Sequence, residues 1–356
     1  MKNFKKITAL VLALLLMFTF AACTLSPSNE ETTVNGETTE AVKTDDTTAY
    51  NGEKIKVAAI KGPTGMGMVN LMDDSKYEFT LTGDPTEVVS LIATKAVDIA
   101  ACPLNVAANL YKKTGGNVKM LGVNTLGVLY VVTNGEAVTG MEDLEGKTVY
   151  STGQGATPEF IINHLIEKNG LKDTKVEYLS EHSELAAKLI SGGAEIAVLP
   201  EPFVTVATSK SENVKVAFSL TDEWNKVNED TELAMGCVIV RADFAKENPD
   251  AVEAFIKDNK ASVEYVNRNP QEAAQKMVQK GIVDSAVFAV NETDEKKAEA
   301  AKAEKAKQVI SRCNIVFVDG EMMKTVANAN YQVYFDANPA SIGGEMVSDE
   351  LYYEAK

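Results

Sequence analysis

Two glycine-rich loops with hydroxyl and amide side chains are the segments of this sequence best suited to bind a small molecule. Residues 61–67 read Lys-Gly-Pro-Thr-Gly-Met-Gly, and residues 152–157 read Thr-Gly-Gln-Gly-Ala-Thr. Glycine lets the backbone approach a ligand closely, and threonine and glutamine side chains both donate and accept hydrogen bonds. We expect these loops, together with two polar residues that follow other strands, to contact a ligand. The candidate ligand-binding residues are Lys61, Gly62, Pro63, Thr64, Gly65, Asn105, Thr152, Gly153, Gln154, Gly155, Thr157 and Glu201.

Several of these candidates also have a purely structural interpretation. The first loop could be a tight turn, Asn105 and Thr157 could cap helices, and Glu201 could be a solvated acid in a first helical turn. The methionines at positions 66 and 68 could line an adaptable apolar wall or belong to the core. For the second loop a substitution separates the two interpretations: Gln154→Ala should weaken ligand binding and leave the fold intact.

The sequence predicts binding without catalysis, and it predicts no metal and no cofactor. A Gly-Lys-Ser/Thr sequence is missing from the loops, so they do not form a Walker phosphate-binding loop. The two histidines, His164 and His182, fall within a predicted helix and near a helix start, and neither is expected on a ligand loop. No cysteine–histidine cluster has metal spacing. Cys102, Cys237 and Cys313 lie in apolar surroundings, which favours buried free thiols and leaves one disulfide open.

The net charge of the chain and the charges in the predicted ligand loops indicate which ligands and partners the protein can bind. The chain has 51 acidic and 35 basic residues, a net charge of −16, and only three arginines, which is opposite to the pattern of nucleic-acid binders. The predicted ligand loops carry one clear cation, Lys61, whereas phosphates and dicarboxylates usually attract arginine. We therefore expect a neutral or weakly charged polar ligand, heteroaromatic molecules included. Sulfonate and nitrate stay open because helix N-termini alone can hold an anion.

The elements that must position these loops are strands that alternate with helices. This alternation is typical of an α/β fold with a mostly parallel sheet covered on both faces. Ligands bind such sheets at the carboxyl ends of the strands, where the candidate loops lie. One helix begins at Asp84-Pro85, where the aspartate is the expected N-cap. The expected strands are 55–60, 77–81, 97–102, 118–123, 147–151, 175–179, 195–199 and 214–218, with 128–133 and 236–241 carrying the chain between lobes.

The chain contains two similar units. Residues 97–103, Val-Asp-Ile-Ala-Ala-Cys-Pro, align with residues 194–200, Ala-Glu-Ile-Ala-Val-Leu-Pro, and each segment follows a helix that contains Leu-Ile. The order of strands and helices around both segments is also the same. We expect two Rossmann-like lobes, with residues 53–126 and 243–356 in lobe 1 and residues 127–242 in lobe 2.

The C-terminal part of lobe 1 is predicted to be helical. Asn248-Pro249 and Asn269-Pro270 each read as an N-cap followed by a proline in the first helical position. Residues 292–307 are rich in Glu, Lys and Ala and predict a solvated helix.

The N-terminus predicts export. Lys2, Lys5 and Lys6 precede an apolar run that ends in Phe-Ala-Ala-Cys at residues 20–23. This pattern resembles a lipoprotein signal peptide, residues 1–23, which implies cleavage before Cys23 and lipidation of its thiol; an ordinary secretory peptide is the alternative. The polar residues 24–52 predict a disordered tether. We therefore expect a protein anchored by lipid alone to the outer face of a bacterial cell membrane.

Together these features resemble the substrate-binding lipoproteins of ABC transporters, in the group for nitrate, sulfonates, taurine and thiamine-pyrimidine precursors. The segments that carry the resemblance are residues 61–67, 98–100, 151–159 and 199–202, and it covers about residues 53–356. It implies a type II periplasmic-binding-protein fold, in which two hinge strands join lobes that close over a small molecule, and a C-terminal segment that returns to lobe 1.

The resemblance also implies a function and its alternatives. It implies an ABC permease as the partner of the closed protein, and we expect a monomer. One alternative is an enzyme on the same fold, of the pyrimidine-precursor type, whose histidine-dependent form needs a histidine in the cleft. The other is a lipoprotein sensor that presents its ligand to a membrane receptor.

Overall fold

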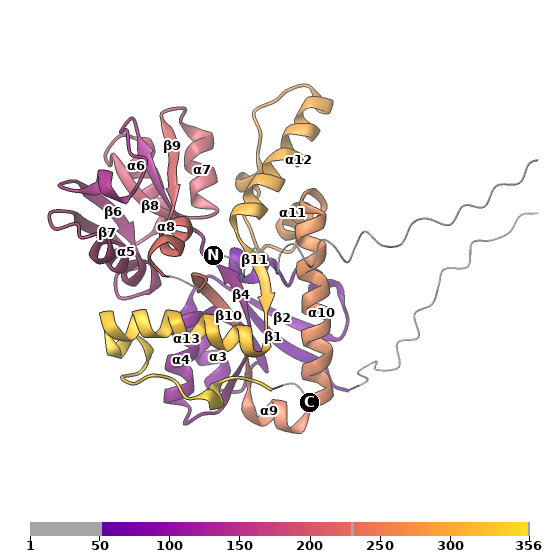
Figure 1. Ribbon diagram of the computed structural model, residues 1–356. Helices are drawn as coiled ribbons and strands as arrows, with labels where there is room; N and C mark the ends of the chain where they lie inside the picture. The colour runs from indigo at the N-terminus through magenta and orange to yellow at the C-terminus, as the bar shows by residue number, and fades with distance from the viewer. Residues whose placement is uncertain (1–51, 229–230, 355–356) are drawn as a thin grey trace, which may run out of the picture. The chain divides into compact units, whose positions relative to one another are not determined.

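The computed structural model describes residues 52–228 and 231–354, whose strands form two sheets (Figure 1). The strands of the first sheet are β1 (Ile55–Ile60), β2 (Tyr77–Thr82), β3 (Ile99–Pro103), β4 (Val118–Leu126), β10 (Ala234–Arg241) and β11 (Ile315–Val318). Those of the second sheet are β5 (Leu129–Asn134), β6 (Thr148–Thr152), β7 (Lys175–Leu179), β8 (Ile196–Pro200) and β9 (Val214–Ser219). We use lobe 1 and lobe 2 for the parts of the molecule built on the first and second sheet.

Helices connect and cover these strands. Lobe 1 contains α2 (Pro63–Met66), α3 (Pro85–Ala93), α4 (Leu104–Lys113), α9 (Ala242–Glu247), α10 (Pro249–Arg268), α11 (Pro270–Gln279), α12 (Glu295–Arg312) and α13 (Gly320–Ala337). Lobe 2 contains α5 (Thr157–Lys168), α6 (His182–Ile190), α7 (Phe203–Lys210) and α8 (Leu220–Val227). Short 3₁₀ turns are η1 (Leu71–Asp73), η2 (Met141–Leu144), η3 (Ser285–Phe288), η4 (Pro339–Ile342) and η5 (Asp349–Leu351).

Most strands of each sheet run in one direction, as expected, but both sheets are mixed because some strands run against the others. In lobe 1, β1 pairs in parallel with β2 and β3, while β10 is antiparallel to β3 and β4. In lobe 2, β6 is parallel to β7 and β8, while β5 is antiparallel to β8 and β9. The antiparallel strand arises because each sheet receives one inner strand from chain that has just left the other lobe.

The strand orders confirm the predicted duplication. Lobe 1 reads β2-β1-β3-β10-β4, with β11 added at the edge, and lobe 2 reads β7-β6-β8-β5-β9. The two aligned sequence segments form β3 and β8, which hold the same central position in their sheets. The repeated acid-Ile-Ala pattern therefore marks equivalent strands.

The chain crosses between the lobes beside the two predicted hinge strands. Each of these strands pairs within one sheet, β5 in lobe 2 and β10 in lobe 1, because its backbone groups find all their strand partners there. The first crossing is at Gly127. A Cβ at this position would lie 2.0 Å from the hydroxyl oxygen of Thr221 and 2.9 Å from a methyl carbon of Leu233, so only glycine fits.

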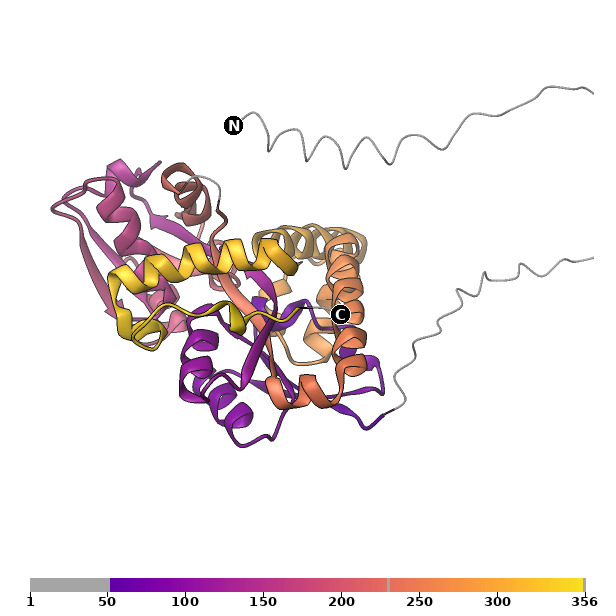
Figure 2. The ribbon, with the colours of Figure 1, turned by 60° about the horizontal axis from the view of Figure 1, so that its bottom comes forward.

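Helix α13 packs against both lobes (Figure 2). The ring of Tyr334 lies 5.7 Å from that of Phe160 on α5 of lobe 2. In lobe 1, the Tyr331 hydroxyl donates to the carbonyl of Leu104 at 2.9 Å. The residues after this helix return to lobe 1, as expected, where the Asn109 amide donates to the Ser341 carbonyl at 2.6 Å.

Asn248 and Asn269 do not cap the helices that follow them, contrary to the prediction. Asn248 and Asn269 precede the prolines of α10 and α11, but neither side chain accepts a bond from its own helix. Each amide instead donates back to the previous helix, Asn248 to Phe244 and Asn269 to Tyr265. A single residue separates α9 from α10 and another separates α10 from α11. Each of these asparagines therefore ends one helix and precedes the next. Asp84 does cap α3, as predicted, by accepting from the Thr86 amide at 2.8 Å.

Helix α12 is longer and less solvated than the sequence predicted. It extends to Arg312, and its C-terminal turns bury Ala306, Val309 and Ile310 against lobe 1. The repeated Glu, Lys and Ala residues describe only the exposed first part of the helix. Its buried end carries Arg312 toward lobe 2.

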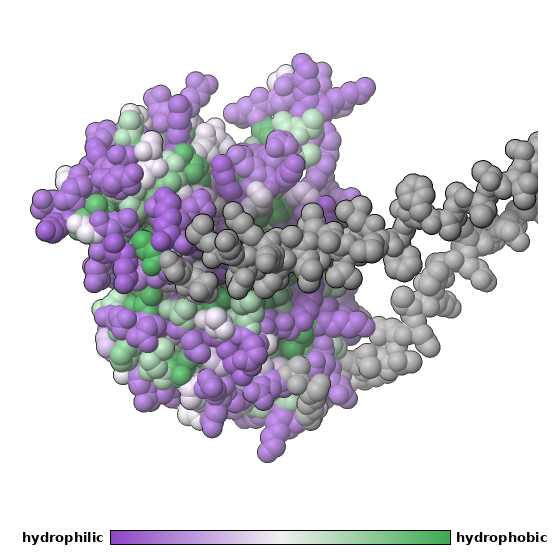
Figure 3. Space-filling model, viewed as in Figure 1, coloured by the Kyte–Doolittle hydropathy of each residue, from purple (hydrophilic) through white to green (hydrophobic). Residues whose placement is uncertain are grey.

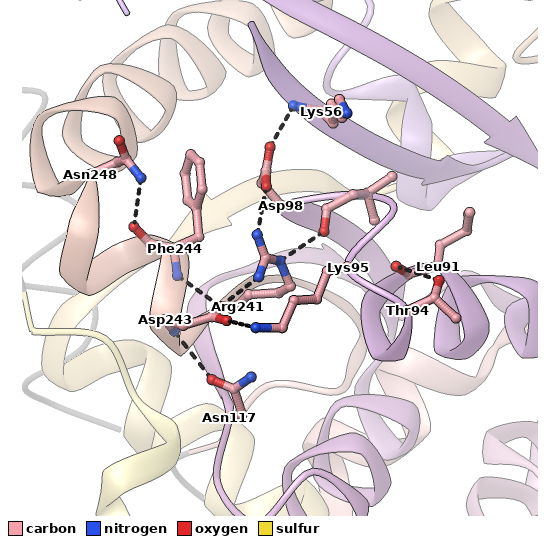
Figure 4. Close-up of polar contacts among 11 residues, drawn as sticks. Lys56, Leu91, Thr94, Lys95, Asp98, Asn117, Arg241, Asp243, Phe244 and Asn248 are labelled. Carbon is pink, nitrogen blue, oxygen red and sulfur yellow. Dashed lines mark hydrogen bonds and ion pairs between the residues drawn. The ribbon is translucent and has the colours of Figure 1, made fainter. Parts of the chain in front are cut away.

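A cluster of ion pairs fixes the far end of β10, away from the predicted ligand loops (Figure 4). Arg241 bonds Asp98 at 2.9 Å and Asp243 at 2.7 Å, and its third nitrogen donates to the Val97 carbonyl at 3.1 Å. Lys95 also pairs with Asp243, at 2.5 Å. The cluster therefore joins the ends of β3 and β10 to α9 and has a structural explanation.

The predicted signal peptide 1–23, Cys23 and almost all of the predicted tether 24–52 lie outside the described residues. Within the described part of the chain, every helix is too short or too polar to cross a membrane.

Candidate functional site

A cavity of about 390 Å³ lies between the two lobes, and we call it the ligand cavity. Its walls come from the residues that follow β1, β3, β6 and β8, all at the carboxyl ends of their strands. Eight of the twelve candidate residues line it. These are Lys61, Gly62, Pro63, Thr64, Asn105, Gly153, Thr157 and Glu201.

The other four candidates lie outside the cavity wall. Gly65 is buried against the end of β1, where a Cβ would come within 2.5 Å of the Ile60 carbonyl oxygen. Thr152 is buried, whereas Gln154 and Gly155 are exposed. The Gly155 amide donates to the Glu159 carboxylate, which holds this turn to the start of α5.

Two polar side chains meet across the cavity. The Thr157 hydroxyl of lobe 2 donates to the side-chain oxygen of Asn105 of lobe 1 at 3.3 Å, and both residues are buried. Neither side chain caps its own helix, so the capping interpretation is wrong for both. Among the described residues, the Asn105 amide nitrogen makes no hydrogen bond, so it is free to donate to a bound molecule.

Asn124 positions the first loop. This residue near the end of β4 donates from its side chain to the Thr64 carbonyl at 2.8 Å. Gly236 on β10 packs beside both, since a Cβ there would lie 2.9 Å from the Asn124 oxygen and 3.1 Å from the Thr64 methyl carbon. The hinge region therefore supports the loop from behind.

Glu201 is a buried acid, which overturns its interpretation as a solvated first-turn residue. Its carboxylate accepts from the Thr205 hydroxyl at 3.0 Å and from the Thr205 amide at 3.2 Å. Burial raises the pKa of Glu201, and the Thr205 hydrogen bonds and the charge of Arg312 offset part of this effect. Because its side chain is fully buried, the carboxylate depends on these partners for its polar contacts.

Arg312 approaches Glu201 from lobe 1. It is the last residue of α12, and its guanidinium lies 3.5 Å from the Glu201 carboxylate. The Tyr130 hydroxyl of lobe 2 donates to the Arg312 carbonyl at 3.1 Å, and Asn314 donates to the Gly127 carbonyl. No local pattern predicts this connection, because Arg312 is 111 residues away from Glu201 in the sequence.

His182 lines the ligand cavity, so its predicted position away from the ligand loops is wrong. Its Nδ1 lies 2.5 Å from the Thr152 hydroxyl, and its ring centre lies 5.2 Å from that of Phe203, another cavity residue. Burial lowers the pKa of His182, and the nearby charge of Glu181 offsets part of the shift. The signal was available: His182 follows β7, so the carboxyl-end rule applies to it as well.

The remaining cavity wall is mostly apolar. It includes Pro103, Leu129, Met235 and Phe203, with Thr125 as a further hydroxyl. The methionines at positions 66 and 68 are fully buried in the core rather than in this wall.

Within residues 52–228 and 231–354, no three His, Cys, Asp or Glu side chains gather in a metal-binding cluster. Cys102, Cys237 and Cys313 are buried free thiols, as the sequence favoured.

Comparison with known families identifies the chain. Residues 76–273 match the family described as NMT1/THI5 like. The chain belongs to the NMT1/THI5-like family. The matched region begins one residue before β2, ends in α11 and includes all of lobe 2. A search of curated proteins found no match.

Solved structures show the fold of this family member. An ABC transporter protein from Parabacteroides distasonis has a TM-score of 0.70 at 21% identity, covering 86% of this chain and 100% of that one. The periplasmic aliphatic sulphonate binding protein SsuA from Escherichia coli has a TM-score of 0.64 at 10% identity, covering 86% and 93%. A Candida albicans gene product with the generic periplasmic binding protein fold has a TM-score of 0.51 at 14% identity, covering 84% and 92%. The chain therefore has the periplasmic-binding-protein fold.

Proposed function

We propose that this protein is an exported solute-binding lipoprotein that captures a small polar ligand between its lobes and delivers it to an ABC importer. The observation that carries the proposal is the ligand cavity, whose polar side chains follow strand ends of both lobes. Membership of the NMT1/THI5-like family and the fold shared with the sulphonate binding protein support it. In this proposal, a lipid on Cys23 anchors the protein to the outer face of the bacterial cell membrane. The protein is a monomer, and the permease recognises it when its lobes are closed.

The cavity wall supports a neutral or weakly charged polar ligand. Asn105, Thr64 and Thr125 offer donors and acceptors without charge, and Phe203 beside His182 offers an aromatic surface. Among the described residues, Lys61 is the one lysine or arginine in the wall, and it is exposed. A heteroaromatic molecule suits this wall, and sulfonate and nitrate are the alternatives.

Native mass spectrometry of residues 47–356 tests the proposal. These residues form one compact unit, so the body can be produced without its N-terminal segment. A ligand with a micromolar dissociation constant binds by about 8 kcal/mol, and tighter ligands survive purification. We expect an extra mass that disappears on denaturation. A bare protein that also shows no thermal shift with pyrimidines, sulfonates or nitrate contradicts the proposal.

One observation supports the enzyme alternative: His182 lines the cavity. Incubating the body with the retained molecule, and repeating this with His182→Gln, separates the two functions. A binding protein leaves the mass of the molecule unchanged in both cases. Turnover by the unmodified protein but not by the variant would establish the enzyme.

A further inference from the structure

A second hollow between the lobes adjoins the ligand cavity, and we call it the apolar groove. It has a volume of about 640 Å³ and lies between α6 and α7 of lobe 2 and residues 281–287 of lobe 1. Lys61, Gly62, Pro202 and Phe203 line both spaces, so the groove continues directly from the cavity.

The walls of the apolar groove are hydrocarbon on both sides. Lobe 2 contributes Ile190, Phe203 and Val206, and lobe 1 contributes Ile282 and Val287, which are 1% and 4% exposed. The half-buried side chains of lobe 2 offer a long molecule most of this apolar surface, which water would otherwise cover. Figure 3 shows mostly hydrophilic residues on one face of the molecule, with hydrophobic residues also visible along the boundary between the lobes.

Charged side chains are few in this lining. Among its described residues they are Lys61, Lys210 and Asp284, all of them exposed. Asp284 also uses its carboxylate to cap the turn η3, by accepting from the Ala286 amide at 2.7 Å. An ionic or strongly polar group would therefore find little to bind inside the groove.

The groove is tied to the ligand loop by the backbone. The Gly62 amide donates to the Ile282 carbonyl at 3.0 Å, which fixes the wall formed by residues 281–287 against the first ligand loop. On the other side, Val206 of lobe 2 packs against the apolar cluster of lobe 1. A molecule lying in both spaces would contact both lobes.

We propose that the ligand is amphipathic, with its polar head in the ligand cavity and an apolar tail that passes Phe203 into the apolar groove. This inference rests on the proposed function and names the ligand class for the same cleft. A tail in the groove would bury hydrocarbon between the lobes and so favour their closed arrangement. Each buried methylene should strengthen binding about fourfold.

Two homologous series with different heads test the inference by calorimetry on residues 47–356. The probes are 1-alkanesulfonates and 1-alkyluracils with alkyl chains of two to eight carbons. We expect affinity to rise by about fourfold per methylene in at least one series. The variant Ala187→Phe fills the groove from the exposed surface of α6 and should abolish this rise. The matched control Glu184→Phe adds the same ring to an exposed position of α6 outside the groove and should keep it.

Three results would overturn the inference: affinities that do not change with chain length, a rise that Ala187→Phe leaves intact, or no binding by the octyl members. A groove that instead receives a protein segment would give the first of these. If native mass spectrometry finds a bound ligand while the series show no gain, the proposed function stands and the inference falls. If no mass is retained and neither series binds, both fail.

Discussion

One pair of side chains, Asn105 and Thr157, makes a polar contact across the ligand cavity. Asn105 is buried, faces Thr157 of the other lobe and lines the cavity, whereas Gln154 is exposed and lies outside it. A hydrogen bond from a neutral group contributes about 1 kcal/mol, and leaving a buried partner unsatisfied costs more. The position of a side chain, rather than its chemical type, therefore decides which of these amides can contribute to binding.

This difference gives a paired prediction. Asn105→Ala should weaken binding of the co-purified molecule by tenfold or more in calorimetry. Gln154→Ala should change the affinity by less than threefold, because its side chain does not reach the cavity wall. A larger loss with Gln154→Ala would show that the second loop moves onto the ligand, as the sequence alone had suggested.

His182 makes the stability depend on pH. Burial lowers its pKa below the ordinary 6.5, so the unfolded chain binds a proton more readily than the folded chain. The free energy of unfolding should therefore fall as the pH drops below about 6.5. Urea denaturation between pH 5 and 8 measures this, and NMR should show the imidazole titrating below 6.5. His182→Gln should have a flatter profile, and an identical profile would contradict the assignment.

At the scale of elements, the end of α12 ties lobe 1 to lobe 2. Arg312 faces the fully buried Glu201, and removing one partner of a buried ion pair leaves the other charge uncompensated. Arg312 is 25% exposed, which moderates the effect because water reaches the guanidinium. The connection therefore stabilises the contact between two elements that are distant in sequence.

A double-mutant cycle tests this connection. Arg312→Ala should lower the free energy of unfolding by about 2 kcal/mol at pH 7. The same substitution should cost clearly less in a Glu201→Gln background, because no buried charge is then left unpaired. Urea denaturation of the four proteins measures both values. Equal costs in the two backgrounds would mean that the pair contributes nothing.

The pH dependence of Glu201 offers a control for the same cycle. Burial raises its pKa above the ordinary 4.5, so the folded chain holds the proton more tightly than the unfolded chain. As the pH rises above about 4.5, the unmodified protein should lose stability relative to Glu201→Gln. A difference that grows in the opposite direction would contradict the raised pKa.

In the whole molecule, each sheet contains one inner strand that lies next to a crossing of the chain from the other lobe. β5 enters lobe 2 directly after β4 of lobe 1, and β10 enters lobe 1 after the chain leaves lobe 2. Helix α13 adds contacts with both lobes. The ligand cavity lies between two bodies that are joined by short crossings, which is a suitable arrangement for closure around a ligand.

The proposed lipid anchor gives the final prediction. If Cys23 carries the lipid, Cys23→Ser should move the protein from the membrane fraction to the soluble extracytoplasmic fraction of the producing bacterium, because apolar acyl chains supply the anchor. Immunoblots of the two fractions measure this. Retention of the variant on the membrane would mean that another segment or partner holds it there.

The sequence predicted the repeated strand order well because its signals are local. The Asp-Ile-Ala and Glu-Ile-Ala segments marked β3 and β8, and the alternation of strands and helices placed eight of the candidate residues around one cavity. It missed the mixed pairing of both sheets, since β5 and β10 read as ordinary strands and their partners lie far away in the chain. It also missed His182, although the position after β7 was a usable signal.

Local patterns in the amino-acid sequence specify which segments become strands, helices and polar loops, because hydrophobic spacing, prolines and glycines act over a few residues. The packing of the folded chain places Asn105 opposite Thr157, buries Glu201 beside Arg312 and leaves Gln154 exposed, and no local pattern predicts these positions. These relations depend on how distant segments pack, and packing sets the burial and partners from which the chemistry of each side chain follows.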